Sequence, residues 1–326
     1  MMTRRLAGDM VNATGLGCMN LSHAYGVPVS AEVGTALLHR ALDLGVTHFD
    51  TAAIYGFGRN EELVGTALKS HRRQIFLASK CGMTGVDGKR VIDGRPEALK
   101  RTCEAALKRL QTDVIDLYYL HRWDRSVPIE ECVGTLGDLV REGKIQHVGL
   151  SEVSAPTLLK AHKEQAISAV QSEYSLWTRN PEVAVLQACQ EIGAALVAFS
   201  PLGRGFLSGA VTNTSFAEND IRIPMPRFQQ DNLSQNLAWL AEFLHIANRA
   251  AVTPAQLALA WVLSRGDHVH AIPGTASPAH LAENMTVPDI DADLLKEVGF
   301  LINPDVVKGA RYPALNQSEV DTEEMI

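Results

Sequence analysis

Several features that would assign a chain to a particular compartment or metal are missing from this sequence. Its five cysteines are widely spaced and form neither a CxxC pair nor a cysteine–histidine cluster with zinc spacing. We therefore expect free thiols in a reducing compartment and no metal site. No apolar run approaches the ~18 residues of a membrane helix, and the N-terminus MMTRRLAGDM has no apolar signal core. These absences predict a cytoplasmic protein that does not enter a membrane.

Positive charge is also scarce. The 326 residues include 30 lysines and arginines against 37 aspartates and glutamates, which gives a formal net charge of −7. This balance argues against general binding to nucleic acid or to an anionic membrane, although it leaves room for a local basic pocket. Hydrophobic residues make up 46% of the chain and charged residues 21%, as in an ordinary globular protein.

What the sequence does contain is a regular alternation of short apolar runs and longer segments with helical spacing. The eight apolar runs span residues 14–19, 46–52, 74–80, 113–121, 145–151, 167–173, 194–200 and 268–274. Most of them lack polar alternation, which is typical of parallel strands that are covered on both faces. Eight such units predict one (β/α)₈ TIM barrel domain over residues 1–326.

Both ends of the chain are expected to add to this barrel. A short hairpin should precede the first strand, and the polar residues 303–326 should form a loosely packed C-terminal extension. A doubly wound open sheet is the alternative fold, but it usually carries G-x-G-x-x-G after its first strand. The corresponding stretch here, TGLGCMNLS, lacks the third glycine.

Four polar residues stand where catalytic groups of such barrels lie, at the carboxyl ends of strands. Asp50, Lys80 and His121 each end an apolar run, and Tyr55 follows on the glycine-rich stretch FDTAAIYGFGRNEELVG. Each residue taken alone has an ordinary structural explanation, such as a helix cap or a solvent contact. Their occurrence on one face of the barrel favours a shared function.

These four side chains could together protonate an oxygen atom. The phenol of a tyrosine in water has a pKa of about 10, and a neighbouring ammonium from Lys80 would lower it. Asp50 could orient Lys80, and His121 could position a substrate oxygen by a hydrogen bond. Tyr55 would then act as a general acid while a cofactor delivers hydride to the carbon of a carbonyl group.

The chain resembles the aldo-keto reductases, in particular the branch related to pyridoxal reductase and auxin-induced proteins. The resemblance covers residues 14–284 and is carried by GLGCMNLSHAYG, THFDTAAIYGFGRNEELVG, IDLYYLHRWD, GKIQHVGLSE, VQSEYSLWTR, FSPLGRGFLSG, TPAQLALAWVL and IPGTASPAHLAEN. It implies a (β/α)₈ barrel, reduction of a small carbonyl compound, and a tetrad at the four residues described above.

The resemblance also implies a set of cofactor contacts. Ser151 and Gln171 would bind the nicotinamide carboxamide, and Phe199 would stack on the nicotinamide ring. The family usually has asparagine after this serine, whereas this sequence has Glu152. The remaining implied contacts are Cys18, Met19, Ser200, Leu202, Arg204, Gly274, Thr275, His280, Glu283 and Asn284.

NADPH is the cofactor that the resemblance implies, with NADH as an alternative. The stretch IPGTASPAHLAEN should form the site for the 2′-phosphate of NADPH at a helix N-terminus. The family usually adds lysine or arginine there, whereas this stretch has neither and carries His280 where arginine is common. A neutral imidazole pairs with phosphate less strongly than a guanidinium does.

The substrate pocket is less well defined by the sequence. Trp123, two residues after His121, is the first candidate, together with Tyr25 and Phe57; Arg122 and Trp177 could also face the pocket. Two other functions remain open: oxidation of a pyridoxine-like alcohol or a sugar at the same site, and a cofactor-binding regulatory subunit with little turnover. The oligomeric state cannot be inferred.

Overall fold

The computed structural model describes residues 1–325 and contains a closed parallel barrel. The eight barrel strands lie in the order β12-β11-β10-β9-β8-β5-β4-β3. Parallel bridges from Thr14 to Ala271 and from Gly17 to Gly274 close the sheet on itself. The barrel strands are β3 (Leu16–Gly17), β4 (His48–Asp50), β5 (Phe76–Cys81), β8 (Ile115–Leu120), β9 (Ile145–Ser151), β10 (Ile167–Glu173), β11 (Ala195–Phe199) and β12 (Val269–Ile272). All eight predicted strands and the predicted fold are therefore confirmed.

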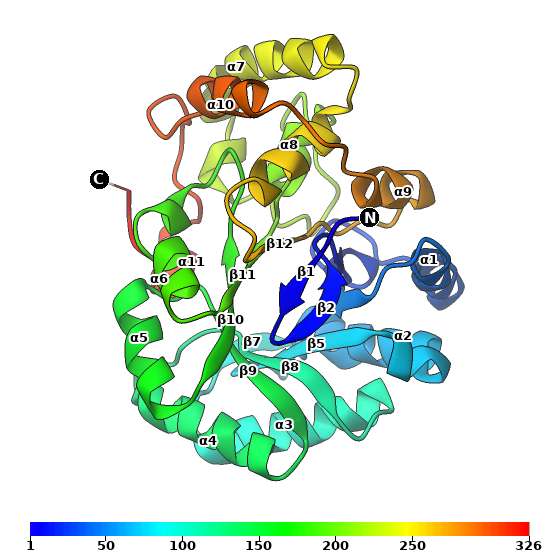
Figure 1. The fold of residues 1–326 in the computed structure, drawn as a ribbon, viewed down its shortest axis with the longest axis vertical. Coiled ribbons are helices and arrows are strands. Elements are labelled where there is room, and N and C mark those ends of the chain that lie inside the picture. Colours follow the sequence, from blue (N-terminus) through cyan, green and yellow to red (C-terminus); the bar gives the residue numbers. More distant parts are fainter. Residues whose placement is uncertain (326) are drawn as a thin grey trace.

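Helices surround the barrel (Figure 1). They are α1 (Ala31–Asp43), α2 (Arg59–Leu68), α3 (Pro96–Leu110), α4 (Ile129–Arg141), α5 (Ala155–Glu164), α6 (Val185–Glu191), α7 (Gln230–Arg249), α8 (Pro254–Leu263), α9 (Pro278–Met285), α10 (Ala292–Leu301) and α11 (Ala314–Gln317). Ser154, Thr253 and Ser277 cap α5, α8 and α9 with their side chains, and a proline occupies the first turn of each of these helices. The caps satisfy backbone N–H groups that have no partner within the helix.

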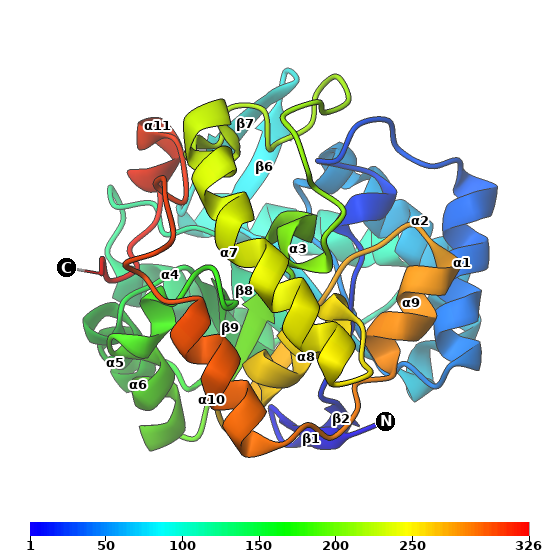
Figure 2. The same cartoon turned by 90° about the horizontal axis from the view of Figure 1, so that it is seen from above.

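Two antiparallel hairpins lie outside the barrel sheet. The first, β1 (Thr3–Leu6) with β2 (Asp9–Asn12), is the predicted N-terminal hairpin, and it covers one end of the barrel (Figure 1). Its Leu6 and Val11 pack into the barrel interior against the same cluster as Leu117 and Val197. The second hairpin, β6 (Met83–Val86) with β7 (Lys89–Ile92), follows β5, and Figure 2 shows it on the side of the molecule opposite β1 and β2. Its Arg90 pairs with Glu319, which follows α11. The first hairpin therefore closes one end of the barrel, and the second contributes Met83 and Arg90 to the wall of a cavity at the other end.

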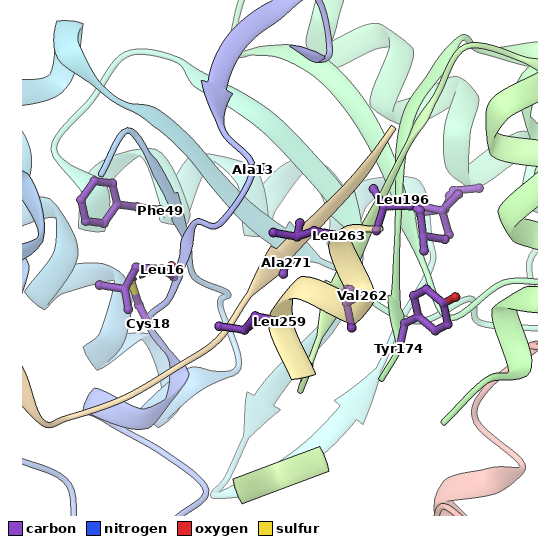
Figure 3. Close-up of a cluster of buried hydrophobic side chains, with 14 of the residues drawn as sticks. Ala13, Leu16, Cys18, Phe49, Tyr174, Leu196, Leu259, Val262, Leu263 and Ala271 are labelled. Carbon is purple, nitrogen blue, oxygen red and sulfur yellow. Dashed lines mark hydrogen bonds between the residues drawn. The ribbon is translucent and has the colours of Figure 1, made fainter. Parts of the chain in front are cut away.

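The larger core lies between the barrel and its helices. Figure 3 shows Leu259, Val262 and Leu263 of α8 next to Ala271 of β12 and Leu196 of β11. All five side chains are buried, and full burial of a leucine or valine contributes about 1.5–3 kcal/mol. This packing holds the strands rigidly, so that groups at the strand ends keep fixed positions.

The C-terminal extension differs from the expectation of loose packing. Tyr312 and Val320 are 8% and 5% exposed, and the Arg311 guanidinium lies 2.5 Å from the Glu152 carboxylate in a buried ion pair. The backbone N–H of Asp321 donates to the Glu152 carbonyl oxygen at 2.9 Å. The polar composition of the extension was misleading because its polar groups have partners on the barrel.

Candidate active site

A cavity of about 820 Å³ opens at the carboxyl ends of the barrel strands. Strand ends, the loops that follow them and the C-terminal extension all contribute to its wall. The predicted residues that line it are Met19, Tyr25, Asp50, Tyr55, His121, Ser151, Gln171, Phe199, Ser200, Leu202, Arg204, Gly274, Thr275, His280, Glu283 and Asn284. Most residues selected from the sequence therefore surround one space.

The four residues of the predicted tetrad lie together at one end of this cavity. Lys80 is fully buried, and its ammonium forms an ion pair with the Asp50 carboxylate. The same ammonium donates to the Thr51 carbonyl oxygen at 2.8 Å and to the Tyr55 hydroxyl at 3.5 Å. The rings of Tyr55 and His121 meet edge to face, with centroids 5.8 Å apart.

Strand register explains this convergence. Asp50 is the last residue of β4 and pairs with Ala78, which places Lys80 two residues further along the neighbouring strand β5 and on the same side. His121 directly follows β8, and its backbone N–H donates to the Cys81 carbonyl oxygen at 2.8 Å. Tyr55 begins the irregular turn Tyr55–Gly58, in which Gly56 and Phe57 both have a positive φ of 56°. The phenol is thus presented to groups that belong to three different strands.

Burial and charge act against each other on the Asp50–Lys80 pair. Burial favours the neutral amine form of Lys80, but the Asp50 carboxylate and the Tyr55 hydroxyl outweigh this effect and raise the lysine pKa. Burial raises the pKa of Asp50, and the Lys80 ammonium opposes that change. The pair is held as two ions because each partner stabilises the charged form of the other.

The pKa of Tyr55 differs from the prediction made from its neighbours. Burial raises it above the ordinary value, and the Lys80 ammonium only partly offsets that effect. The expectation of an unusually acidic phenol was therefore wrong, because desolvation of the phenolate could not be judged from the sequence. Tyr55 consequently keeps its proton at neutral pH. His121 has the opposite behaviour: burial and the charges of Lys80 and Arg122 hold its pKa well below the usual range, so the imidazole is neutral.

Gln171 and Ser151, the two residues predicted to bind the nicotinamide carboxamide, form hydrogen bonds with other side chains of the site. The Gln171 amide nitrogen donates to the Asp50 carboxylate at 2.8 Å, and the Ser151 hydroxyl accepts from the Arg122 guanidinium at 3.3 Å. Gln171 therefore helps to hold the tetrad as well as facing the cavity. Both residues belong to neighbouring parallel strands, β9 and β10, near their carboxyl ends.

A buried network of charges supports the far wall of the cavity. The Arg204 guanidinium donates to the Glu173 carboxylate at 2.6 Å and to the Tyr312 hydroxyl at 3.1 Å. Burial opposes ionisation of Glu173, but the surrounding arginines, Arg204 first, lower its pKa to about 2. Sequence reasoning missed Glu173, although its place at the end of a predicted strand was a usable signal. It also missed Tyr312, for which no local signal exists.

Four predicted site residues do not line the cavity. Lys80 is one of them, and it contacts the lining residues Asp50 and Tyr55; the others are Cys18, Trp123 and Phe57. Cys18 is fully buried and directs its thiol toward the Leu16 carbonyl oxygen at 3.7 Å. The Trp123 indole N–H donates to the Val127 carbonyl oxygen at 2.9 Å, and the ring packs on the outer core. Phe57 is 54% exposed and packs on the β6–β7 hairpin. Trp177, also considered, stacks within an aromatic cluster. Each of these side chains contacts neighbouring protein groups and does not face the cavity.

Two negative observations concern the described residues 1–325. No helix among them is long and apolar enough to cross a membrane. No group of three or more histidine, cysteine, aspartate or glutamate side chains in this range is placed to hold a metal ion.

Comparison with known proteins gives a consistent assignment. The sequence pattern of the Aldo/keto reductase family matches residues 13–297. An NADP(+) aldo-keto reductase of Schizosaccharomyces pombe is 42% identical over 95% of this chain and 94% of its own length. A probable aldo-keto reductase of Glycine max is 43% identical over 94% and 89%. The solved structure of a glycerol dehydrogenase from Gluconobacter oxydans superposes with a TM-score of 0.83 at 29% identity, covering 92% of this chain and 94% of that one. The chain belongs to the aldo/keto reductase family.

Proposed function

We propose that this nicotinamide-dependent reductase converts an aldehyde or ketone to an alcohol, with Tyr55 as the general acid. The observation that carries the proposal is the contact of the Tyr55 hydroxyl with the Lys80 ammonium, at 3.5 Å, beside the His121 ring. A carbonyl oxygen that accepts hydrogen bonds from Tyr55 and His121 would stand at one end of the cavity, within reach of a proton.

Each tetrad residue then has a distinct task. Tyr55 holds its proton until negative charge develops on the substrate oxygen, and it then transfers that proton. The Lys80 ammonium stabilises the phenolate that remains, and Asp50 keeps Lys80 charged and in place. The neutral His121 orients the carbonyl oxygen by a hydrogen bond. Such a preorganised set of dipoles and charges stabilises the transition state more than the ground state.

The cavity fits a nicotinamide dinucleotide, which when bound supplies the hydride. It extends from the tetrad to Gly274 and Asn284, so one elongated molecule could contact both ends. In the part of the chain that the structure describes, the buried Arg204 Nε has no hydrogen-bond partner, as a group awaiting an anionic ligand would. The N-terminus of α9, capped by Ser277, offers further N–H groups for a phosphate.

NADPH is the proposed cofactor, in keeping with the NADP(+) reductase of Schizosaccharomyces pombe. NADH remains a second candidate because residues 273–285, at the proposed 2′-phosphate end, include no lysine or arginine. Initial rates with each cofactor separate the two: comparable Michaelis constants would support dual use, and a strong preference for NADPH would contradict it.

Replacement of Tyr55 by phenylalanine tests the proposed acid. We expect kcat to fall about 10²- to 10⁴-fold, while NADPH still quenches the protein fluorescence with unchanged affinity. Tyr118→Phe is the matched control, because Tyr118 is buried in the outer core away from the cavity. Retained turnover in Tyr55→Phe would remove Tyr55 as the acid.

Oxidation of an alcohol is the reverse reaction at the same atoms, and the structural similarity to a glycerol dehydrogenase favours testing it. We also propose that the chain falls in the branch related to pyridoxal reductase and auxin-induced proteins, so pyridoxal and pyridoxine belong among the substrates to be screened. The five unpaired thiols, all buried, support a reducing, cytoplasmic location. Stable association with a partner and little turnover would instead indicate a regulatory subunit.

A further inference from the structure

Arg122 is a cavity residue to which the proposed mechanism gives no task. It directly follows His121 and lines the cavity at the tetrad end. One nitrogen of its guanidinium, Nη1, donates to the His121 carbonyl oxygen at 2.6 Å and to the Ser151 hydroxyl at 3.3 Å. These two bonds fix the orientation of the planar group.

The two other nitrogens of Arg122 are left without a protein acceptor. Nε and Nη2 make no hydrogen bond, and no carboxylate lies within 4.0 Å of the guanidinium, among residues 1–325. Together these nitrogens form the edge of the guanidinium that binds a carboxylate through two parallel hydrogen bonds. The fixed Nη1 therefore leaves the bidentate edge available.

Each of the other arginines that line the cavity already has a carboxylate partner. Arg90 lies 2.5 Å from Glu319, Arg204 lies 2.6 Å from Glu173, and Arg222 lies 2.7 Å from Asp220. Arg122 thus differs from three neighbours that each have a carboxylate partner. Its bond to the His121 carbonyl oxygen holds the guanidinium beside the tetrad.

Neither carboxylate that lines the cavity neutralises the Arg122 guanidinium. Asp50 is bound by Lys80 and by Gln171. Glu283 belongs to α9, at the end of the cavity that Thr275 and Asn284 share. The tetrad end therefore carries one uncompensated positive charge, which would disfavour a cationic substrate and attract an anionic one.

We infer that the substrate is a carbonyl compound that also carries a carboxylate group, and that the free edge of Arg122 binds this carboxylate. Arg122 then fixes the distance between the acid group and the carbonyl carbon, while Tyr55 and His121 hold the carbonyl oxygen. This inference rests on the proposed function of the same site, and it narrows the substrate class to oxo-acids and aldehyde acids.

Matched pairs of substrates test the inference with the complete enzyme and NADPH. The pairs are 2-, 3- and 4-carboxybenzaldehyde with the methyl ester of each, which preserves the carbonyl group and removes the charge. We expect the wild-type kcat/KM for at least one acid to exceed that for its ester by roughly tenfold to a hundredfold, the range of a charge-assisted hydrogen bond. Arg122→Met should abolish this ratio, and Arg122→Lys should retain part of it.

Arg125→Met is the control variant. Arg125 lies on the same loop, is 56% exposed and pairs with Asp321 outside the cavity, so its removal should leave the acid-to-ester ratio unchanged. Arg122 also donates to the Ser151 hydroxyl, so acid and ester are compared at saturating NADPH, where any effect on cofactor binding is common to both substrates. The affinity for NADPH is measured separately by fluorescence quenching.

Each outcome separates substrate recognition from other roles. If Arg122→Met lowers kcat/KM by the same factor for the acid and for its ester, Arg122 only supports His121, and the inference is wrong. A wild-type enzyme that reduces every ester as well as its acid would also overturn it. Weaker NADPH binding by Arg122→Met together with an unchanged acid-to-ester ratio would assign the residue to the cofactor instead. If no aldehyde of either kind is reduced, the proposed function itself fails.

Discussion

Two buried histidines at the closed end of the barrel should make this protein sensitive to acid. His48, the first residue of β4, is completely buried, and neither of its ring nitrogens has a hydrogen-bond partner among residues 1–325. His270 of β12 is also buried, with its ring centroid 6.5 Å from that of His48. Its Nε2 contacts the Arg5 carbonyl oxygen at 3.1 Å. A protonated imidazole at either position would lack water and lie beside a second imidazole.

The direction of the effect follows from proton linkage. Burial lowers the pKa of His48 to about 3 and that of His270 to about 4, whereas a histidine in the unfolded chain titrates near 6.5. The unfolded state therefore binds protons that the folded state excludes. The associated stability is fully present above about pH 6.5 and is lost as the pH falls toward the folded-state values.

At pH 5 the two histidines should reduce stability by a few kcal/mol in total. This pH lies about 1.5 units below the pKa of the unfolded chain, and each unit corresponds to about 1.4 kcal/mol. Each histidine should then remove about 2 kcal/mol of unfolding free energy relative to pH 8. His48→Leu keeps an apolar group of similar size and eliminates one titrating site. We expect this variant to lose about 2 kcal/mol less than the wild type between pH 8 and pH 5.

Urea unfolding at the two pH values, followed by circular dichroism, measures this difference. His245→Leu is the control, because His245 is exposed on α7. Equal pH-dependent losses in wild type and His48→Leu would refute the reasoning. A large loss for His48→Leu at pH 8 would show instead that the imidazole has a packing role that leucine cannot replace.

Two further substitutions test other features of the structure. Arg311→Met leaves the Glu152 carboxylate buried without its cation, so it should lower the free energy of unfolding by about 3–5 kcal/mol. The double variant Arg311→Met with Glu152→Gln should lose less stability. An unchanged urea midpoint for Arg311→Met would contradict the buried pair. Trp123→Phe removes one hydrogen bond to Val127 outside the cavity, so it should lower the free energy of unfolding by about 1 kcal/mol. The KM for aldehydes should be unchanged. A raised KM would place Trp123 at the substrate.

The barrel and its tetrad were predictable because both depend on local patterns. A strand covered on both faces requires a continuous apolar run, and each such run was visible. A polar residue at the end of a run is conspicuous for the same reason, as Asp50, Lys80 and His121 show. Parallel strands then bring their carboxyl ends to one edge without any further information. The sequence could therefore indicate that these side chains meet before any distance was known.

The residues that sequence reasoning misplaced depend on contacts between distant segments. Trp123 stands two residues from His121, yet its indole finds a backbone acceptor on its own loop. Glu152 lies next to Ser151, but it turns to Arg311, which is 159 residues away in the chain. The pKa of Tyr55 depends on how completely the phenol is removed from water, and burial of that kind follows only from the assembled barrel.

The overall charge of the chain and the charge at the tetrad end of its cavity have opposite signs, and this contrast bears on substrate choice. The net charge of −7 is spread over the sequence as a whole, and exposed charges are screened within about 10 Å at ordinary ionic strength. A carboxylate inside the cavity would be sheltered from that screening and would respond mainly to Arg122 and Lys80. Because Asp50 already balances Lys80, Arg122 supplies the remaining positive charge at the tetrad end of the cavity. An acidic protein can therefore select an acidic substrate, provided that the selecting charge is fixed in the cavity and lacks a partner there.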